Sequence, residues 1–338
     1  MDLALAPLAT IVAIASAATV IGGSQLASRG AGPAPERPGF PPAVKTLGAV
    51  AIPVGGVPTD VEATPHATWV STSLGTIVRV DPTTNERAAR IDVGGSVVAI
   101  EHGLGALWAI DVFENRLLRI DPMTDRVVRE IPVDPLPSGL ALGHGLVWVA
   151  SQLESTVAGI DPRTGDVVKL ARFARGELWP GGLAVGPAGV WVITGAGNEV
   201  SLFDPATMRF RYRVPVAGAR TVVAAGRSAW IGLAAARSVA RIRDGRMSRF
   251  DTGSRASGYG PLLALGQQLW VVSGATLVTI ALDTGAIDGR LDLEGRVGLA
   301  ALALGDDPWV VDVEQRALVR LPPSGGGRYA LPVARASR

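Results

Sequence analysis

The chain has 338 residues and a formal net charge of +2, and 48% of its residues are hydrophobic, 18% charged and 5% aromatic. This apolar content excludes an intrinsically disordered protein, and the absence of cysteine excludes disulfides, zinc–thiolate sites, iron–sulfur clusters and cysteine nucleophiles. The isoelectric point of about 9.4 reflects a small excess of arginine in a chain with three tyrosines, and because no run of five basic residues occurs, we expect no nucleic-acid partner.

The first predicted element is residues 3–23, which are 21 consecutive uncharged residues. A helix of this length would span about 31 Å, enough for the hydrocarbon core of a membrane. Two interpretations stay open: a single transmembrane anchor, or a signal peptide cleaved near the small residues at 15–17. The anchor is favoured, because the apolar stretch is longer than the roughly 7–15 residues of a usual signal core and no Lys or Arg precedes it. Either one would carry the following domain out of the cytoplasm. The positive-inside rule points the other way, because Arg29, Arg37 and Lys45 all follow the segment.

Residues 24–43 are the next element, with prolines at positions 33, 35, 38, 41 and 42. Proline fixes the backbone in extended conformations, so this stretch predicts a semi-rigid linker. The predicted organisation is therefore a signal or anchor at 1–23, a linker at 24–43 and one folded domain at 44–338.

The folded domain consists of a repeat of about forty residues. Its periodic tryptophans follow each other at intervals of 39, 40, 43, 39, 40 and 39 residues. In each repeat an apolar phrase such as LVWVAS (146–151) surrounds the tryptophan. A small-residue strand such as SGLALG (138–143) precedes it, and an aspartate turn such as DPRTG (161–165) follows 12 to 14 residues later in six of the repeats. The seven tryptophans are Trp69, Trp108, Trp148, Trp191, Trp230, Trp270 and Trp309.

Each repeat predicts four short β-strands, because valine-rich and isoleucine-rich runs of four to eight residues alternate with Gly, Pro and Asp. Seven four-stranded units of this length predict an all-β, seven-bladed β-propeller of antiparallel blades. We expect the small-residue strand to be innermost, the tryptophans to pack between blades, and the aspartates to hold hairpin turns. The stretch 45–56 is the preferred strand to close the ring, with 328–333 as the alternative.

The repeat resembles the bacterial propeller repeats of the YVTN, NHL and virginiamycin B lyase-like family, most clearly in PSGLALGHGLVWVASQLESTVAGIDPRTGDVV (137–168). The resemblance covers residues 45–333. It implies an exported propeller, because family members include exported binding propellers, sensor domains and a magnesium-dependent lyase. Such lyases resemble one another in a Trp-Phe-Thr-Glu phrase, whereas every periodic tryptophan here is followed by Val, Ala or Ile. No lyase catalytic residue can be carried over.

Candidate binding residues gather on one face of the predicted disk, where the loops that follow the tryptophan strands and the loops that enter the innermost strands meet. The first set supplies a residue that is polar in six of seven repeats, three positions after each tryptophan. His66, His102 and His144 are expected in turns on the opposite face, so no metal site and no cofactor is predicted. The binding candidates are Trp179, Arg220, Tyr259, Arg296, Asp111, Glu114, Asp312 and Glu314.

Trp179 is singled out because it is the one tryptophan outside the periodic series and lies in ARFARGELWPGG (171–182), where the longest repeat has its extra residues. Aromatic and arginine side chains often dominate binding energies, so Trp179 with Arg220 and Tyr259 predicts a recognition site. The alternative is that Trp179 packs as a plug over neighbouring strands.

Two functions remain open. The first is an exported, non-catalytic propeller that binds a protein or a small ligand on this face and reaches the membrane through its N-terminal segment. The second is a metal-dependent lyase or hydrolase that uses Asp111, Glu114, Asp312 or Glu314 around a divalent cation. The sequence favours the first, because the face lacks histidine and the chain lacks the lyase phrase.

Overall fold

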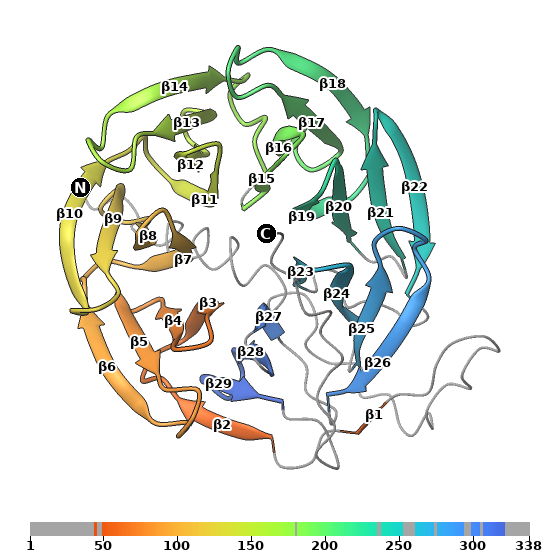
Figure 1. Cartoon of the computed structure of the whole chain (residues 1–338). Coiled ribbons are helices and arrows are strands. Elements are labelled where there is room, and N and C mark those ends of the chain that lie inside the picture. The colour runs from red at the N-terminus through yellow and green to blue at the C-terminus, as the bar shows by residue number, and fades with distance from the viewer. Residues whose placement is uncertain are drawn as a thin grey trace, which may run out of the picture.

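Figure 1 shows seven β-sheets arranged around a common axis, which confirms the expected seven-bladed propeller. This computed structural model describes residues 44–45, 49–179, 181–234, 238–252, 261–273, 276–293, 299–304 and 307–321. These residues contain strands and turns but no helix. The predicted N-terminal segment (1–23), the linker (24–43) and the alternative closing strand (328–333) lie outside the described residues.

Blades 1 to 4 follow one another along the chain, and in each blade the first strand lies nearest the axis. Their strands are, in blade 1, β3 (Pro58–Ala63), β4 (Thr68–Thr72), β5 (Thr76–Val80) and β6 (Arg87–Asp92); in blade 2, β7 (Val97–Gly103), β8 (Ala106–Asp111), β9 (Arg116–Asp121) and β10 (Arg126–Pro132); in blade 3, β11 (Pro137–Gly143), β12 (Leu146–Ser151), β13 (Thr156–Ile160) and β14 (Val167–Arg172); and in blade 4, β15 (Leu183–Gly186), β16 (Gly189–Thr194), β17 (Glu199–Phe203) and β18 (Phe210–Pro215).

Blades 5 to 7 complete the ring, and blade 6 carries an additional two-residue strand that pairs parallel to its outer edge. Their strands are, in blade 5, β19 (Ala219–Ala225), β20 (Ser228–Leu233), β21 (Ser238–Arg243) and β22 (Arg246–Asp251); in blade 6, β23 (Leu262–Leu265), β24 (Gln268–Ser273), β25 (Thr276–Ala281), β26 (Ile287–Asp292) and the parallel strand β1 (Val44–Lys45); and in blade 7, β27 (Leu299–Leu304), β28 (Pro308–Asp312), β29 (Ala317–Arg320) and β2 (Val50–Pro53).

The N-terminal strand β2 closes the ring. It forms the outer strand of blade 7 by antiparallel pairing with β29, from Val50 opposite Arg320 to Pro53 opposite Ala317. The preference for the stretch 45–56 as the closing strand is therefore confirmed. Because β2 continues directly into blade 1, this pairing joins the first repeat to the last and protects a sheet edge.

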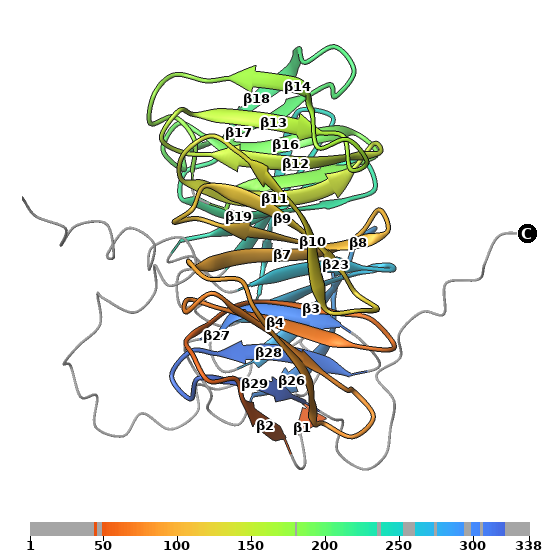
Figure 2. The ribbon, with the colours of Figure 1, turned by 90° about the vertical axis from the view of Figure 1, so that its left-hand side faces the viewer.

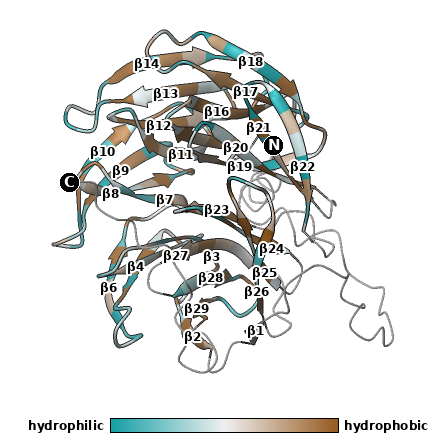
Figure 3. Ribbon diagram, turned by 45° about the vertical axis from the view of Figure 1, so that its right-hand side comes forward, coloured by the Kyte–Doolittle hydropathy of each residue, from teal (hydrophilic) through white to brown (hydrophobic). Residues whose placement is uncertain are grey.

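All seven periodic tryptophans lie in the second strand of their blade and are buried. Trp148 of blade 3, for example, packs with Val190 and Phe203 of blade 4. The second strands are apolar on both faces because each face contacts a neighbouring blade, whereas outer strands such as β18 carry both hydrophilic and hydrophobic residues (Figure 3). The prediction that these tryptophans pack between blades is confirmed.

The repeated aspartates hold the turns between the third and fourth strands, as expected. The Asp81 carboxylate accepts the backbone N–H of Thr83, and the Asp161 carboxylate accepts that of Arg163, both at 2.7 Å. These hydrogen bonds to the ionised form lower the pKa of Asp81 and Asp161. The repetition of aspartate is thus a requirement of turn geometry.

Arginines on the third strands connect one blade to the next. Arg320 lies opposite Trp309, places its guanidinium over that indole, and donates to the Asn85 side chain of blade 1 at 3.0 Å. Arg241 of blade 5 stacks over Trp230 in the same way and donates to two backbone carbonyls of blade 6. A planar guanidinium can stack and bridge at once, which the lysine ammonium cannot do. This role accounts for part of the preference for arginine over lysine, which occurs in this chain only at positions 45 and 169.

Candidate functional site

The antiparallel order of the strands puts two sets of connections on the same face of the ring. The second and fourth strands of a blade run in the same direction, so the loop after the second strand and the connection to the next blade emerge together. Figure 2 shows the ring from its edge, with the connections gathered on its two faces. We call the face that carries these two sets the loop face.

The position that ends the second strand is buried in every blade, and this differs from the polar rim expected from the sequence. Its seven residues are Thr72, Asp111, Ser151, Thr194, Leu233, Ser273 and Asp312. Their polar atoms bond within the loops above them: the Thr72 and Thr76 hydroxyls lie 2.6 Å apart, and the Thr194 hydroxyl donates to Glu199 at 2.9 Å. Both faces of the second strand contact neighbouring blades, so these side chains are buried and support the loops.

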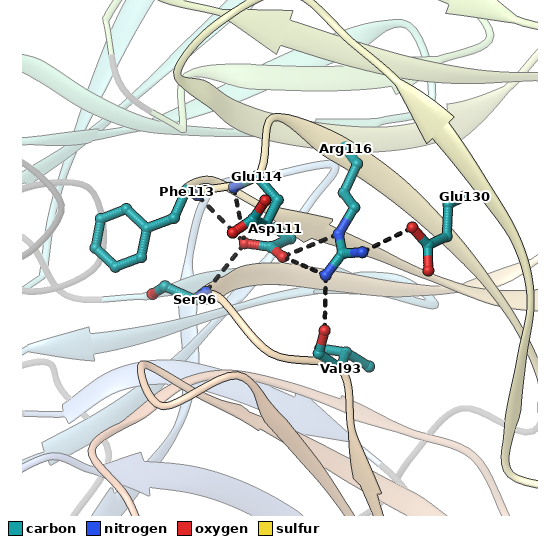
Figure 4. Close-up of polar contacts among 7 residues, drawn as sticks. All are labelled: Val93, Ser96, Asp111, Phe113, Glu114, Arg116 and Glu130. Carbon is teal, nitrogen blue, oxygen red and sulfur yellow. Dashed lines mark hydrogen bonds and ion pairs between the residues drawn. The ribbon is translucent and has the colours of Figure 1, made fainter.

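Asp111 shows the arrangement most fully (Figure 4). Its carboxylate is 0% exposed, and one oxygen accepts the backbone N–H groups of Ser96, Phe113 and Glu114. The other oxygen pairs with the Arg116 guanidinium at 3.0 Å. Asp111 therefore holds its own loop together.

Arg116 extends this network across the loop face. Its guanidinium also donates to the Val93 carbonyl at 2.7 Å and to the Glu130 carboxylate at 2.7 Å. Burial lowers the pKa of Arg116, but the hydrogen bonds and charges of Glu130 and Asp111 outweigh that effect and raise it. Arg116 thus stays charged and ties three segments of the chain to one another.

Backbone hydrogen bonds make the loops of blades 1, 2 and 3 one continuous surface. Between blades 1 and 2, the N–H of Val93 donates to the Gly75 carbonyl at 2.9 Å. Between blades 2 and 3, Asn115 accepts two N–H groups of the connection, and Leu136 accepts the N–H of Gln152 at 3.0 Å. Each loop is therefore braced by the connection beside it.

Close packing in this surface requires glycine at position 95. Gly95 has a φ of +65°, and a Cβ placed there would lie 2.2 Å from the Asp111 carboxylate. Only glycine combines this left-handed conformation with so close an approach at little cost. The connection can therefore lie directly on the buried carboxylate.

On this braced surface, three large apolar side chains point into solvent. Leu74 is 67% exposed, Phe113 48% and Leu153 43%. Each is the second residue after the end of the tryptophan strand, in blades 1, 2 and 3 respectively, which are neighbours in the ring (Figure 1). We call these three side chains the apolar tips.

The sequence contained a signal for the apolar tips, which our sequence analysis missed. The same loop position holds alanine in blades 4, 5 and 6 and Glu314 in blade 7. A large apolar residue at this position is thus confined to three consecutive repeats. Comparison of the repeats position by position, rather than by shared phrases, would have identified the difference.

Trp179 lies on the same face, in the connection from blade 3 to blade 4. It is partly buried against the core shared by blades 4 and 5, and the Arg220 guanidinium lies over its ring at 4.1 Å. The predicted association of Trp179 with Arg220 is therefore present. The packing of Trp179 against this core agrees with a plug, and its partial exposure agrees with a side chain available at the surface. A role for Trp179 in binding stays a prediction.

The remaining binding candidates differ in their exposure to solvent. Glu114 and Glu314 are exposed in the loops that follow the second strands of blades 2 and 7. Asp312 is buried and accepts the Gln315 N–H at 2.9 Å. Tyr259 and Arg296 lie outside the described residues. The four acidic candidates thus divide into two exposed carboxylates and two buried ones that support loops.

Three carboxylates at the centre of the ring form a second feature that the sequence analysis did not select. Asp60 and Glu62 lie on β3 and Glu101 on β7, the innermost strands of blades 1 and 2. Each accepts a backbone N–H from the innermost strand of the next blade; Asp60 accepts that of Ile100 at 2.9 Å. These carboxylates satisfy N–H groups at a sheet edge and connect blades 1, 2 and 3.

The environment of these carboxylates favours their protonated forms. Burial raises the pKa of Asp60 to about 6 against the opposing effect of its hydrogen bonds. Burial, and then the charges of Glu101 and Asp60, raises the pKa of Glu62 to about 8. Burial, with a contribution from Asp60, raises the pKa of Glu101 to about 7. At neutral pH the cluster therefore holds bound protons in the folded protein.

This arrangement predicts that Glu62→Gln stabilises the protein selectively at high pH. A glutamate in the unfolded chain ionises near pH 4.5, so between that pH and about 8 the folded state binds more protons. The stabilising contribution of Glu62 is fully present below its pKa in the unfolded chain, 4.5. It is lost as the pH rises through its pKa in the folded protein, about 8. We expect Glu62→Gln to raise the free energy of unfolding by about 1–2 kcal/mol at pH 8.5 and to have little effect at pH 5.

Denaturant unfolding at both pH values measures this difference. Glu86→Gln, a change at an exposed turn residue, is the control. The same change in stability at pH 5 and pH 8.5 for Glu62→Gln would contradict the prediction.

The histidines do not converge on a site. His66 and His144 lie in turns as expected, but the expectation was wrong for His102, which lies within β7 and stacks on Trp69 with ring centroids 5.5 Å apart. Within the described ranges no group of three or more His, Cys, Asp or Glu side chains is arranged to hold a metal ion. Nor does any helix in this part of the chain have the length and apolarity needed to cross a membrane.

Comparison with protein-family models and with curated proteins gave no match. Solved structures do match the fold. A chain of Kuenenia stuttgartiensis hydrazine synthase has a TM-score of 0.68 and 13% identity, and the match covers 83% of this chain and 98% of that one. A streptogramin B lyase has a TM-score of 0.67 and 14% identity, with 81% and 96% covered. The resemblance to virginiamycin B lyase-like propellers is thus confirmed at the level of the fold.

Proposed function

We propose that this propeller is a non-catalytic binding module whose loop face recognises a partner through the apolar tips. The observation that carries the proposal is the exposure of Leu74, Phe113 and Leu153 at one equivalent position of three adjacent blades. Large apolar side chains that gather on one face commonly mark an interaction site. Exposed apolar residues that stand singly, such as Met123 and Met247, need no such explanation.

The rigidity of the loops supports this proposal. The buried Asp111 and Thr72 side chains and the hydrogen bonds between connections hold the tips in place before any partner arrives. A preorganised surface loses less conformational entropy on binding, so more of the contact energy appears as affinity. The loops are therefore suited to recognition.

The proposed location of the module is outside the cytoplasm. The support is the apolar segment 3–23, which has the length of an anchor or of a long signal, followed by a proline-rich linker. We expect a protease added to spheroplasts to digest the domain; complete protection would place the domain in the cytoplasm.

A metal-dependent lyase or hydrolase receives less support. Of the four carboxylates considered for it, Asp111 and Asp312 are buried beneath their loops. The two solved propellers described above bear the names of enzymes, but at 13% and 14% identity the likeness extends to the fold alone. We therefore favour the binding module.

Capture of partners by matched variants tests the proposal. Immobilised protein carrying Leu74→Ser, Phe113→Ser and Leu153→Ser is compared with wild type after chemical cross-linking in a membrane extract. The control carries Leu104→Ser, Met123→Ser and Leu265→Ser, which remove three exposed apolar side chains from two turns and the end of β23 on the opposite face. We expect the loop-face variant alone to lose the cross-linked species. Equal loss in both variants, or in neither, would refute the proposal.

A further inference from the structure

The charge around the apolar tips identifies the chemistry of their partner. In blades 2 and 3 the residue directly after the tip is a glutamate, Glu114 after Phe113 and Glu154 after Leu153. Both carboxylates are exposed, and neither forms an ion pair among the residues that the structure describes. Two negative charges thus lie beside two of the three apolar tips.

The basic side chains of the same surface do not neutralise these glutamates. Arg116 is engaged by Asp111 and Glu130, and Arg90 pairs with Asp92 at 2.8 Å. The exposed Arg172 and Arg175 lie at the end of β14 and in the connection that follows, beside the Leu153 loop, where Ser155 accepts the N–H groups of Phe173 and Gly176. The surface over blades 1 and 2 therefore combines apolar contacts with the unpaired negative charge of Glu114, and Glu154 adds an exposed carboxylate that forms no ion pair among the described residues.

We propose that this surface binds a polypeptide segment in which apolar side chains stand next to lysine or arginine. This inference rests on the proposed function and adds the nature of the partner to it. Apolar side chains of the segment would cover the tips, and its cations would pair with Glu114 and Glu154. Charge pairs at the rim of an interface contribute mainly to specificity and to the rate of association, so the glutamates select among apolar segments.

The same charges argue against a lipid surface as the occupant. Bacterial and other cellular membranes attract proteins through basic residues near anionic lipids, whereas the two side chains beside the tips are acidic. Contact with such a membrane would bring Glu114 and Glu154 against like charge. A basic, apolar polypeptide is the occupant that complements both features.

Selection from a random library of displayed 12-residue peptides tests this proposal on the folded protein. We expect peptides enriched by the wild type to be rich in Leu, Ile or Phe together with Lys or Arg, and poor in Asp and Glu. Synthetic copies should bind Glu114→Gln/Glu154→Gln about tenfold more weakly at low salt. They should also bind wild type more weakly in 0.5 M NaCl, because salt screens exposed charges.

Two further variants separate failure of this inference from failure of the proposed function. If the selected peptides need the three apolar tips but bind Glu114→Gln/Glu154→Gln unchanged, the preference for basic partners is wrong and the binding surface stands. If removal of the tips has no effect on any selected peptide, or if nothing is enriched, the surface itself is refuted. Glu86→Gln serves as the charge control. Binding to anionic phosphatidylglycerol vesicles that depends on the tips would overturn the choice of a polypeptide.

Discussion

Replacing Trp191 with alanine is expected to lower the free energy of unfolding by about 3–5 kcal/mol. The indole is fully buried in the cluster that joins blades 4 and 5, and its ring lies 5.8 Å from that of Tyr212. Truncation removes this apolar contact area and leaves a cavity that rigid sheets on both sides cannot fill. Denaturant unfolding followed by far-UV circular dichroism measures the loss.

Phe113→Ala is the matched control, since it removes an aromatic ring from the solvent-exposed loop of blade 2. We expect this change to leave stability within about 0.5 kcal/mol, because surface substitutions away from caps and strained sites usually do. If Trp191→Ala were as mild as Phe113→Ala, the periodic tryptophans would not be the main packing residues between blades.

The fold could be predicted from the sequence because its requirements recur in every repeat. Each blade needs one large side chain between sheets and one turn after the third strand, and the tryptophans and aspartates such as Asp161 mark both positions at a constant spacing. The sequence also favoured 45–56 over 328–333 as the strand that closes the ring, and the pairing of β2 with β29 decides between the two. Repetition makes such features visible without any knowledge of contacts.

The candidate site was less predictable because it depends on departures from the repeat. The position that ends the tryptophan strand looked like a solvent-facing rim, yet Asp111 and Asp312 are buried under their loops. A polar residue can equally be a ligand contact or a loop support, and only the hydrogen-bond geometry distinguishes the two. The tips were overlooked for the opposite reason, since a single exposed leucine or phenylalanine carries no signal until its neighbours in the ring are known.

The central carboxylates illustrate the same limit. Glu62 and Glu101 occupy the position opposite the tryptophan that holds alanine, valine or leucine in the other five blades. Sequence alone shows that these two repeats differ, but the pKa of Glu62 is raised by burial and by the charges of Glu101 and Asp60, and the pKa of Glu101 by burial and by Asp60 of the neighbouring blade. Such coupling between repeats requires the folded arrangement.

Replacing Asp111 with alanine is expected to lower the free energy of unfolding by about 2–4 kcal/mol and to weaken binding at the loop face as well. Removal of the carboxylate leaves three backbone N–H groups without their acceptor and deprives Arg116 of its buried partner. The loss is limited because Glu130 still pairs with Arg116. The loop that presents Phe113 should loosen, so we expect limited proteolysis to cut first between residues 111 and 116.

Asp111→Asn distinguishes this supporting role from direct contact with a ligand. The amide keeps one oxygen acceptor for the backbone N–H groups but loses the charge that pairs with Arg116, so a loss of about 1–2 kcal/mol is expected. Under the supporting role, binding falls in step with loop order across the series wild type, Asn and Ala, because the tips lose their fixed positions. If Asp111 instead contacted a partner or a metal ion, Asp111→Asn would abolish binding while the protease pattern and the unfolding midpoint stayed close to those of the wild type.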